Sequence, residues 1–276
     1  MTYDYFKNIH GRNSYDNSGG VLKSYVHYGV NYVNAGWNGV FHHMIYGDGN
    51  ASVDILTSLD IVAHEIGHGI TQFTAGLVYS GESGAINESF SDIWGVCVQN
   101  YAAPNKQIWL SGDEITTPPV RNMSNPLLSS PPQPATYGGG PNWTGPNAGV
   151  HTNSGIMNHW FYILSVGKSG TNGIGNAYNV TGISISKAEK IAYRTLTVYM
   201  TSGTNFANAR THTIQAAIDL YGYCNPEVIA VTNAWYAVGV GGSYVAPTNT
   251  VNTNPIYNSG TTTINANNIN ILHYNK

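Results

Sequence analysis

Two histidines and a glutamate within residues 61–71 have the types and spacing needed for metal-dependent chemistry. The segment IVAHEIGHGIT places His64 and His68 four residues apart and Glu65 directly after the first histidine. Residues four apart share one face of a helix, so both imidazoles could reach one tetrahedral Zn²⁺ at roughly 2.0–2.1 Å. Glu65 would lie beside the metal, where it could take a proton from a metal-bound water. The alternative interpretation is a pair of histidines with satisfied hydrogen bonds near a core.

A third ligand would separate these interpretations, and Glu88 offers one. It lies in GAINESFSD, with 19 residues between His68 and Glu88. Asp92 follows one helical turn later, where a carboxylate can accept the free N–H of a ligand histidine. The alternative for both acids is a solvated helix face, but the segment continues as the apolar IWGVCV, and carboxylates in apolar surroundings need partners. A His₂Glu set with one open position is typical of catalytic rather than structural zinc sites.

Helices over residues 60–74 and 87–101 are predicted to carry these side chains. Apolar residues around the histidines indicate that the first helix is an interior one. Gly67 and Gly69 weaken that helix intrinsically, so tertiary packing must hold it. The metal site would therefore sit in the core rather than on a surface loop.

The remaining chain divides into three parts. Residues 1–60 predict mixed structure, with a short helix over Val21–Tyr32 and strands within 40–49. Residues 111–150 are rich in Pro, Gly and Ser and predict a long irregular loop. Three helices should follow: one capped by Ser186 and Glu189, one running from Phe206 to Tyr221, and one starting at Pro226 after Asn225.

Composition excludes two classes of function. The chain has 276 residues, 9% of them charged, and a net charge of -3, so no basic face for nucleic acid is expected. No apolar run approaches the roughly 18 residues that a membrane span requires. Cys97 and Cys224 could form at most one disulfide, but each lies on an apolar stretch, and we expect both to be small buried residues.

Taken together, these motifs resemble the thermolysin-like family of secreted zinc metalloendopeptidases. The resemblance rests on residues 24–39, 60–95, 120–126 and 149–158 and on the three C-terminal helices, and it covers about residues 3–240 in family order. It implies an α+β, two-lobed zincin fold. Residues 1–75 would form a mixed N-terminal lobe with a sheet that ends in the HExxH helix. Residues 76–240 would form a mainly helical lobe, and the Thr/Asn-rich residues 241–276 a linker or the start of a further domain.

The resemblance also implies a function: zinc-dependent hydrolysis of peptide bonds before apolar residues, by a secreted monomer acting on peptides or proteins. It assigns zinc binding to His64, His68 and Glu88, the general base to Glu65, and oxyanion stabilisation to His151 and Tyr79. It further assigns substrate contacts to Asn34 and Ala35 on an edge strand, to Arg121, and to Ile61 and Val120 in an apolar pocket. Candidate calcium ligands are Asp60, Asp113 and Glu114, although the last two would equally suit a solvated loop. Gln99 stands where an acid is expected, which argues against a paired-calcium site.

Two departures from the family pattern affect these expectations. Family members have a β-rich stretch before TYDYF, and the first residues of this chain lack a secretory signal, so we expect Met1 to be an internal start. The family usually has an acid before the GVH histidine, where this chain has Pro146 and Asn147; Asn147 is expected to supply a side-chain carbonyl to a less basic His151. The alternative functions are an incomplete, catalytically impaired peptidase-like binding module, or an adhesin element suggested by the Thr/Asn-rich tail. The intact ligand set and Glu65 favour the enzyme.

Overall fold

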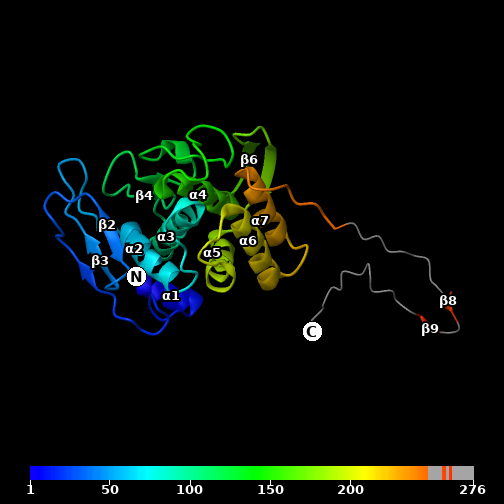
Figure 1. Ribbon diagram of the computed structural model, residues 1–276, viewed down its shortest axis with the longest axis horizontal. Helices are drawn as coiled ribbons and strands as arrows, with labels where there is room; N and C mark the ends of the chain where they lie inside the picture. The colour runs from blue at the N-terminus through cyan, green and yellow to red at the C-terminus, as the bar shows by residue number, and fades with distance from the viewer. Residues whose placement is uncertain (248–256, 259–260, 263–276) are drawn as a thin grey trace. The chain divides into compact units, whose positions relative to one another are not determined.

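The computed structural model describes residues 1–247, 257–258 and 261–262 (Figure 1). The chain divides into two compact units, Met1–Tyr244 and Val245–Lys276. In the second unit, β8 (Tyr257–Asn258) pairs antiparallel with β9 (Thr261–Thr262). The linker or further domain predicted over 241–276 lies mostly outside the described residues, and its nature stays a prediction.

The first unit contains helices and short strands in mixed order, an α+β arrangement. In chain order the elements are α1 (Thr2–His10), β1 (Ser24–Tyr25), β2 (Ala35–Asn38), β3 (His43–Tyr46), α2 (Leu59–Gln72), α3 (Gly81–Ala102), β4 (Leu110–Ser111), β5 (Arg121–Asn122), the 3₁₀ turn η1 (Pro126–Leu128), α4 (Val150–Val166), β6 (Gly167–Thr171), β7 (Ala177–Thr181), α5 (Ile185–Arg194), the π-helical turn η2 (Thr195–Tyr199), α6 (Phe206–Tyr221) and α7 (Pro226–Ala237). Among the helices that the structure describes, none is both long and apolar enough to cross a membrane.

A three-stranded sheet precedes the metal-binding helix. Its order is β1–β3–β2, with β1 parallel and β2 antiparallel to β3, so β2 is an edge strand of the described sheet. Figure 1 shows α2 between these strands and α3. The prediction of a helix over Val21–Tyr32 is wrong. That segment contains β1 and turns at His27, Gly29 and Asn31, which all have positive φ. The predicted strand within 40–49 is confirmed as β3.

Two glycines let α2 pack closely against its neighbours, Gly67 against the central helix α3 and Gly69 against Trp37 of β2. A Cβ on Gly67 would lie 3.0 Å from the Cα of Ser91, and one on Gly69 would lie 3.1 Å from the ring of Trp37. α3 begins six residues before the predicted residue 87 and is buried from Ser83 to Gln99. A helix buried on all sides has no polar face, so its first turn, GESGA, gave no periodic signal.

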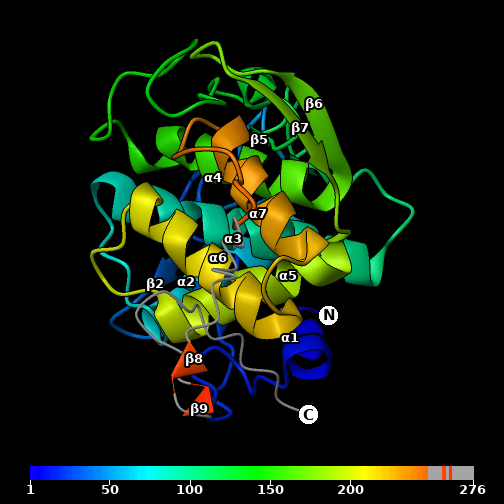
Figure 2. The same cartoon turned by 90° about the vertical axis from the view of Figure 1, so that its right-hand side faces the viewer.

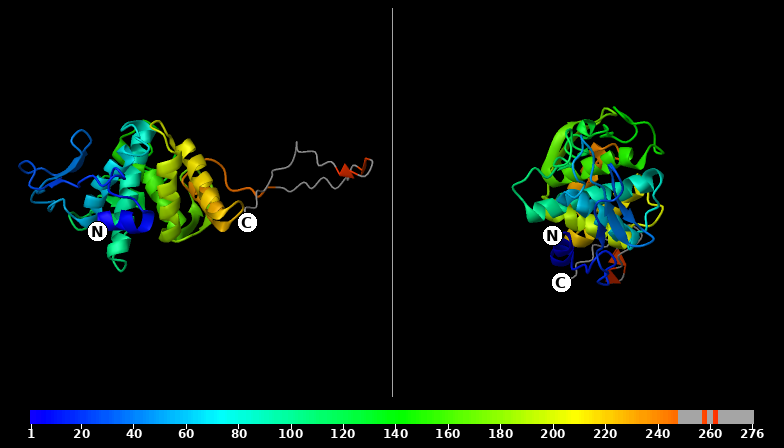
Figure 3. Two further views of the ribbon diagram at one scale, coloured as in Figure 1. Left: turned by 90° about the horizontal axis from the view of Figure 1, so that it is seen from below. Right: turned by 90° about the vertical axis from the view of Figure 1, so that its left-hand side faces the viewer.

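The helices α4, α5 and α6 pack against α3, and α7 packs against α4 and α6 (Figure 2). Seen from below, the sheet and α6 with α7 lie at opposite ends of the first unit (Figure 3). The predicted bounds of α6 and the predicted start of α7 at Pro226 are confirmed. The prediction of a capping box formed by Ser186 and Glu189 is wrong. The N-cap residue of α5 is Ser184, and the Glu189 carboxylate accepts a hydrogen bond from Tyr5. The β6–β7 hairpin was not predicted.

The loop and cysteine predictions had different outcomes. Between residues 111 and 149 the described structure is mostly irregular, as predicted, and is interrupted by β5 and η1. Cys97 is buried, as expected, whereas Cys224 is exposed with a φ of 60, so the prediction for Cys224 is wrong. Both thiols are free. Cys224 lies in the short turn between α6 and α7, where the apolar periodicity of the helices does not apply.

Candidate metal centre and active site

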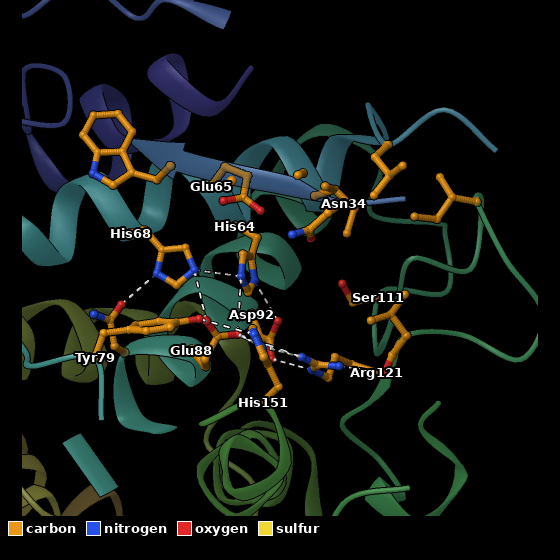
Figure 4. A pocket seen from close by; sticks show the side chains of 18 of the residues that line it. Asn34, His64, Glu65, His68, Tyr79, Glu88, Asp92, Ser111, Arg121 and His151 are labelled. Atoms are coloured by element: carbon orange, nitrogen blue, oxygen red, sulfur yellow. Dashed lines mark hydrogen bonds and ion pairs between the residues drawn. The ribbon is translucent and has the colours of Figure 1, made fainter. Parts of the chain in front are cut away.

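Two helices bring the three predicted metal ligands together. His64 and His68 come from α2 and Glu88 comes from α3, and their ligand atoms lie within 4.8 Å of one another (Figure 4). The two Nε2 atoms are 3.0 Å apart, and they lie 3.7 and 3.3 Å from the Glu88 carboxylate oxygens. Ligands at 2.0–2.1 Å in a tetrahedron would be about 3.3 Å apart, which these distances bracket. The donor set therefore fits one Zn²⁺.

Each histidine is oriented by a bond from its other ring nitrogen. Nδ1 of His64 donates to the Asp92 carboxylate at 2.8 Å, and Nδ1 of His68 donates to the Asn87 side-chain oxygen at 2.8 Å. These bonds leave both Nε2 atoms free to bind a metal, the usual arrangement at such sites. Asn87 was missed in the sequence, although a search for an acceptor beside Glu88 would have found it.

The charges of this cluster are strongly coupled. Burial alone would lower the pKa of His64, but the hydrogen bond to Asp92 and the charges of Asp92 and Glu88 outweigh burial and raise the pKa to about 9. Burial opposes ionisation of Glu88, yet hydrogen bonds from His151 and His68 hold its pKa well below the usual range. The acids are therefore ionised, as a metal site requires.

Asp92 is itself held by groups from outside the two helices. Its Oδ2 accepts a hydrogen bond from Asn158 of α4 at 2.7 Å, and the Asn158 oxygen accepts one from Ser89 at 2.7 Å. The Arg121 Nε lies 3.4 Å from the same Asp92 oxygen. Asn158 was also missed, because nothing in its local sequence indicates that α4 packs here.

The remaining predicted catalytic groups lie around the same cluster. Glu65 is buried and lines the cavity beside the histidines. The Tyr79 hydroxyl donates to the Glu88 carboxylate and lies 3.4 Å from Nε2 of His151. Nδ1 of His151 donates to Glu88 at 2.7 Å. Burial and the Glu88 charge raise the pKa of Tyr79, so its hydroxyl stays a proton donor.

A cavity of about 850 Å³ contains this cluster and the predicted substrate residues. Asn34 and Ala35 line it from the start of β2, and Ile61 and Val120 line it together with other apolar side chains. Arg121 lies at its wall, 3.3 Å from Nδ1 of His151. The structure thus places all the predicted catalytic and substrate residues around one cavity.

One expectation for the residues around this cluster is not met, and the calcium expectation remains untested. In the described part of the chain, Nδ1 of His151 donates to Glu88, lies near Arg121 and makes no bond to Asn147, because the side chain of His151 turns towards α3. The three candidate calcium ligands do not converge within the described residues. Asp60 accepts the N–H of Gly112 at 2.6 Å, while Glu114 pairs with Lys106 at 2.7 Å. Calcium binding stays a prediction.

Comparison with known proteins decides the family. Two protein-family models match this sequence. The one described as "Thermolysin metallopeptidase, catalytic domain" matches residues 1–72, and the one described as "Thermolysin metallopeptidase, alpha-helical domain" matches residues 75–240. The chain belongs to the thermolysin metallopeptidase family. Its site draws on both matched regions, with His64, Glu65 and His68 in the first and Glu88 and His151 in the second.

Relatives within the thermolysin family confirm the predicted α+β fold. Bacillolysin of Bacillus caldolyticus is 46% identical over 248 residues, 87% of this chain and 44% of that protein. Thermolysin of Alicyclobacillus acidocaldarius subsp. acidocaldarius is also 46% identical, over 87% of this chain and 43% of that protein. The solved precursor of protealysin, a metalloproteinase from Serratia proteamaculans, matches with a TM-score of 0.73 and 34% identity over 87% of this chain and 75% of that one. The match thus spans less than half of the two curated relatives.

Proposed function

We propose that this chain carries the active site of a zinc-dependent endopeptidase that hydrolyses peptides or proteins outside the cell as a monomer. The observation that carries the proposal is the convergence of His64, His68 and Glu88, with Glu65 lining the same cavity. Family membership supports metallopeptidase chemistry at this cluster.

The residues divide the reaction between them. Zn²⁺, when bound by His64, His68 and Glu88, supplies a Lewis acid that polarises a carbonyl and lowers the pKa of water. Glu65 accepts the proton of the attacking water and returns it to the leaving amine. Attack of water turns the substrate carbonyl oxygen into an oxyanion. Tyr79 and His151 donate hydrogen bonds to it, since both lie beside the proposed metal ligand Glu88.

The cavity also favours a particular class of substrate. β2, which begins at Ala35, has an edge without a partner strand among the described residues, and this edge can pair with an extended peptide backbone. Ile61 and Val120 give the cavity an apolar wall, which favours an apolar residue after the scissile bond. Arg121 lies at the same wall and is proposed to hold a substrate carbonyl.

The first test measures zinc content and hydrolysis of an internally quenched peptide with Leu or Phe after the cleavage bond, in wild type and Glu65→Ala. We expect about one zinc per chain in both proteins and cleavage by wild type alone, because Glu65 is the base and not a ligand. Zinc in both with cleavage by neither would favour the alternative, a peptidase-like binding module. Absence of zinc from both would refute the metal site.

A further inference from the structure

The His151 ring has little packing to hold it in place. Its side chain is 61% exposed, although its Nδ1 contacts the buried Glu88. An exposed ring that must meet a substrate oxygen depends on the placement of its own backbone. The groups that hold the His151 backbone are therefore relevant to its proposed role.

Gln133 holds that backbone from a buried position in the loop before α4. Its side-chain Nε2 donates to the His151 carbonyl at 2.5 Å and to the Ser154 hydroxyl at 2.9 Å. Its Oε1 accepts from the Ser129 hydroxyl at 3.2 Å. A carbonyl can only accept, so the atom facing His151 must be the amide nitrogen, and both amide protons are used. The side chain is 1% exposed, so water does not compete for these bonds.

A glycine on α4 makes this contact sterically achievable. A Cβ on Gly155 would lie 2.7 Å from the Gln133 Cβ and 2.7 Å from the Pro134 carbonyl. The second turn of α4 therefore lies directly against residues 133–134. No larger side chain would fit at position 155 without moving the helix start that carries His151.

The same buried chain of bonds reaches the strand that carries Arg121. The backbone N–H of Asn122 donates to the Ser129 hydroxyl at 2.9 Å, and that hydroxyl donates to Gln133. Arg121 in turn lies 3.3 Å from Nδ1 of His151. One connected network thus sets the position of β5 relative to the start of α4.

We propose that Gln133 is a positioning residue, which fixes His151, and with it Arg121, at the proposed catalytic cavity. This inference rests on the proposed function, because it assigns His151 the role of oxyanion donor. The position of Gln133 matters because Pro146 and Asn147 supply no side-chain bond to His151 within the described residues. Backbone anchoring by Gln133 adds to the side-chain contacts that the His151 ring makes with Glu88, Tyr79 and Arg121.

The test compares Gln133→Met, which keeps the length of the side chain but removes its hydrogen bonds, with Gln215→Met. Gln215 makes one side-chain bond, to Asp219 on the same helix α6, away from the cavity. We expect Gln133→Met to lower kcat by about 10- to 100-fold with zinc content retained, since small misplacements of catalytic groups cost this much. Gln215→Met should retain wild-type kcat. Gln133→Leu, which has no hydrogen-bonding group, serves as the second variant if Gln133→Met does not fold.

A double-mutant cycle distinguishes positioning from general weakening of the fold. His151→Ala alone should lower kcat about 10²–10³-fold. Adding Gln133→Met should then cost less than about twofold, because a positioning residue acts through His151. An undiminished second loss would overturn the proposal.

An NMR readout decides the inference even if the wild type does not cleave peptides. The ring signal of ¹³C-labelled His151, assigned by its absence in His151→Ala, should shift in both Gln133 variants and not in Gln215→Met. An unchanged signal would refute positioning by Gln133. A wild type that binds zinc but cleaves nothing would instead refute the proposed function, and the signal would still report on Gln133.

Discussion

His64 and His68 each use one ring nitrogen for orientation and leave the other for a metal. The two orienting acceptors differ, because Asp92 carries a charge whereas Asn87 is neutral. A carboxylate acceptor raises the basicity of its histidine more than an amide does. His64 should therefore be the stronger zinc ligand of the pair.

Removing the Asp92 carboxylate tests this difference. We expect Asp92→Ala to weaken zinc binding by about 10- to 100-fold, because His64 loses its orientation and part of its basicity. The zinc dissociation constant is measured by competition with a chelator. Asp48→Ala is the matched control, since Asp48 also pairs with a histidine, His27, at 2.7 Å, but on an exposed surface. Equal zinc affinity in Asp92→Ala and wild type would contradict the expectation.

At the residue scale, sequence spacing predicted the proposed metal ligands. It did not predict the residues that hold those ligands in place. Helical spacing predicts that His64 and His68 share one face, and Glu88 was identified as the third ligand that such a pair needs. Asn158 and Gln133 act across long sequence distances and carry no charge that would single them out. Tyr79, Arg121 and His151 were named only through the family resemblance, because each is unremarkable locally.

At the scale of elements, helices with caps and one apolar face were predictable. α6 has the predicted limits and α7 the predicted start, because Gly222 ends α6 and Asn225 with Pro226 begins α7. The start of α3 was not predictable, because burial on all sides removes the periodic pattern. The β6–β7 hairpin was missed because GKSGT lacks the apolar alternation of a strand and AYNVT offers only two alternating apolar residues, Tyr178 and Val180.

The contact between α2 and α3 gives a prediction at this scale. Alanine normally stabilises a helix by about 1 kcal/mol relative to glycine. Gly67→Ala should instead lower the free energy of unfolding by about 1–3 kcal/mol, because the new methyl would overlap Ser91 and Trp94. Urea unfolding measures the change. Gly203→Ala is the control, since a Cβ there meets nothing within 4 Å and the stability should stay close to wild type. A stabilised Gly67→Ala variant would show that the helices can move apart freely.

At the scale of the whole molecule, buried neutral histidines link stability to pH. His159 donates from Nδ1 to the Met123 carbonyl at 2.8 Å and accepts at Nε2 from Lys168 at 3.2 Å. Burial, together with the charge of Lys168, lowers the pKa of His159 to about 4. Burial likewise lowers the pKa of His10 to about 3. In each case the unfolded chain binds the proton more readily than the folded one.

Acidification should therefore destabilise the fold at pH values well above the pKa values of its carboxylates. His159 contributes fully to the free energy of unfolding above about pH 6.5, its pKa in the unfolded chain. This contribution is lost as the pH falls towards about 4, its pKa in the folded chain. Between pH 7 and 5, wild type should lose about 1–2 kcal/mol more of its unfolding free energy than His159→Gln. Urea midpoints at the two pH values measure this difference. Parallel losses in both proteins would mean that His159 does not remain neutral when folded.

The proposed pairing of a substrate with the edge strand β2 has a consequence for inhibitor design. A flexible peptide must become extended before it can pair with Ala35–Asn38, and ordering its backbone costs about 1–2 kcal/mol per residue. A macrocycle whose backbone is locked as a strand has already lost that freedom. Rigid extended ligands should therefore bind beside Glu65 more tightly than linear peptides with the same side chains.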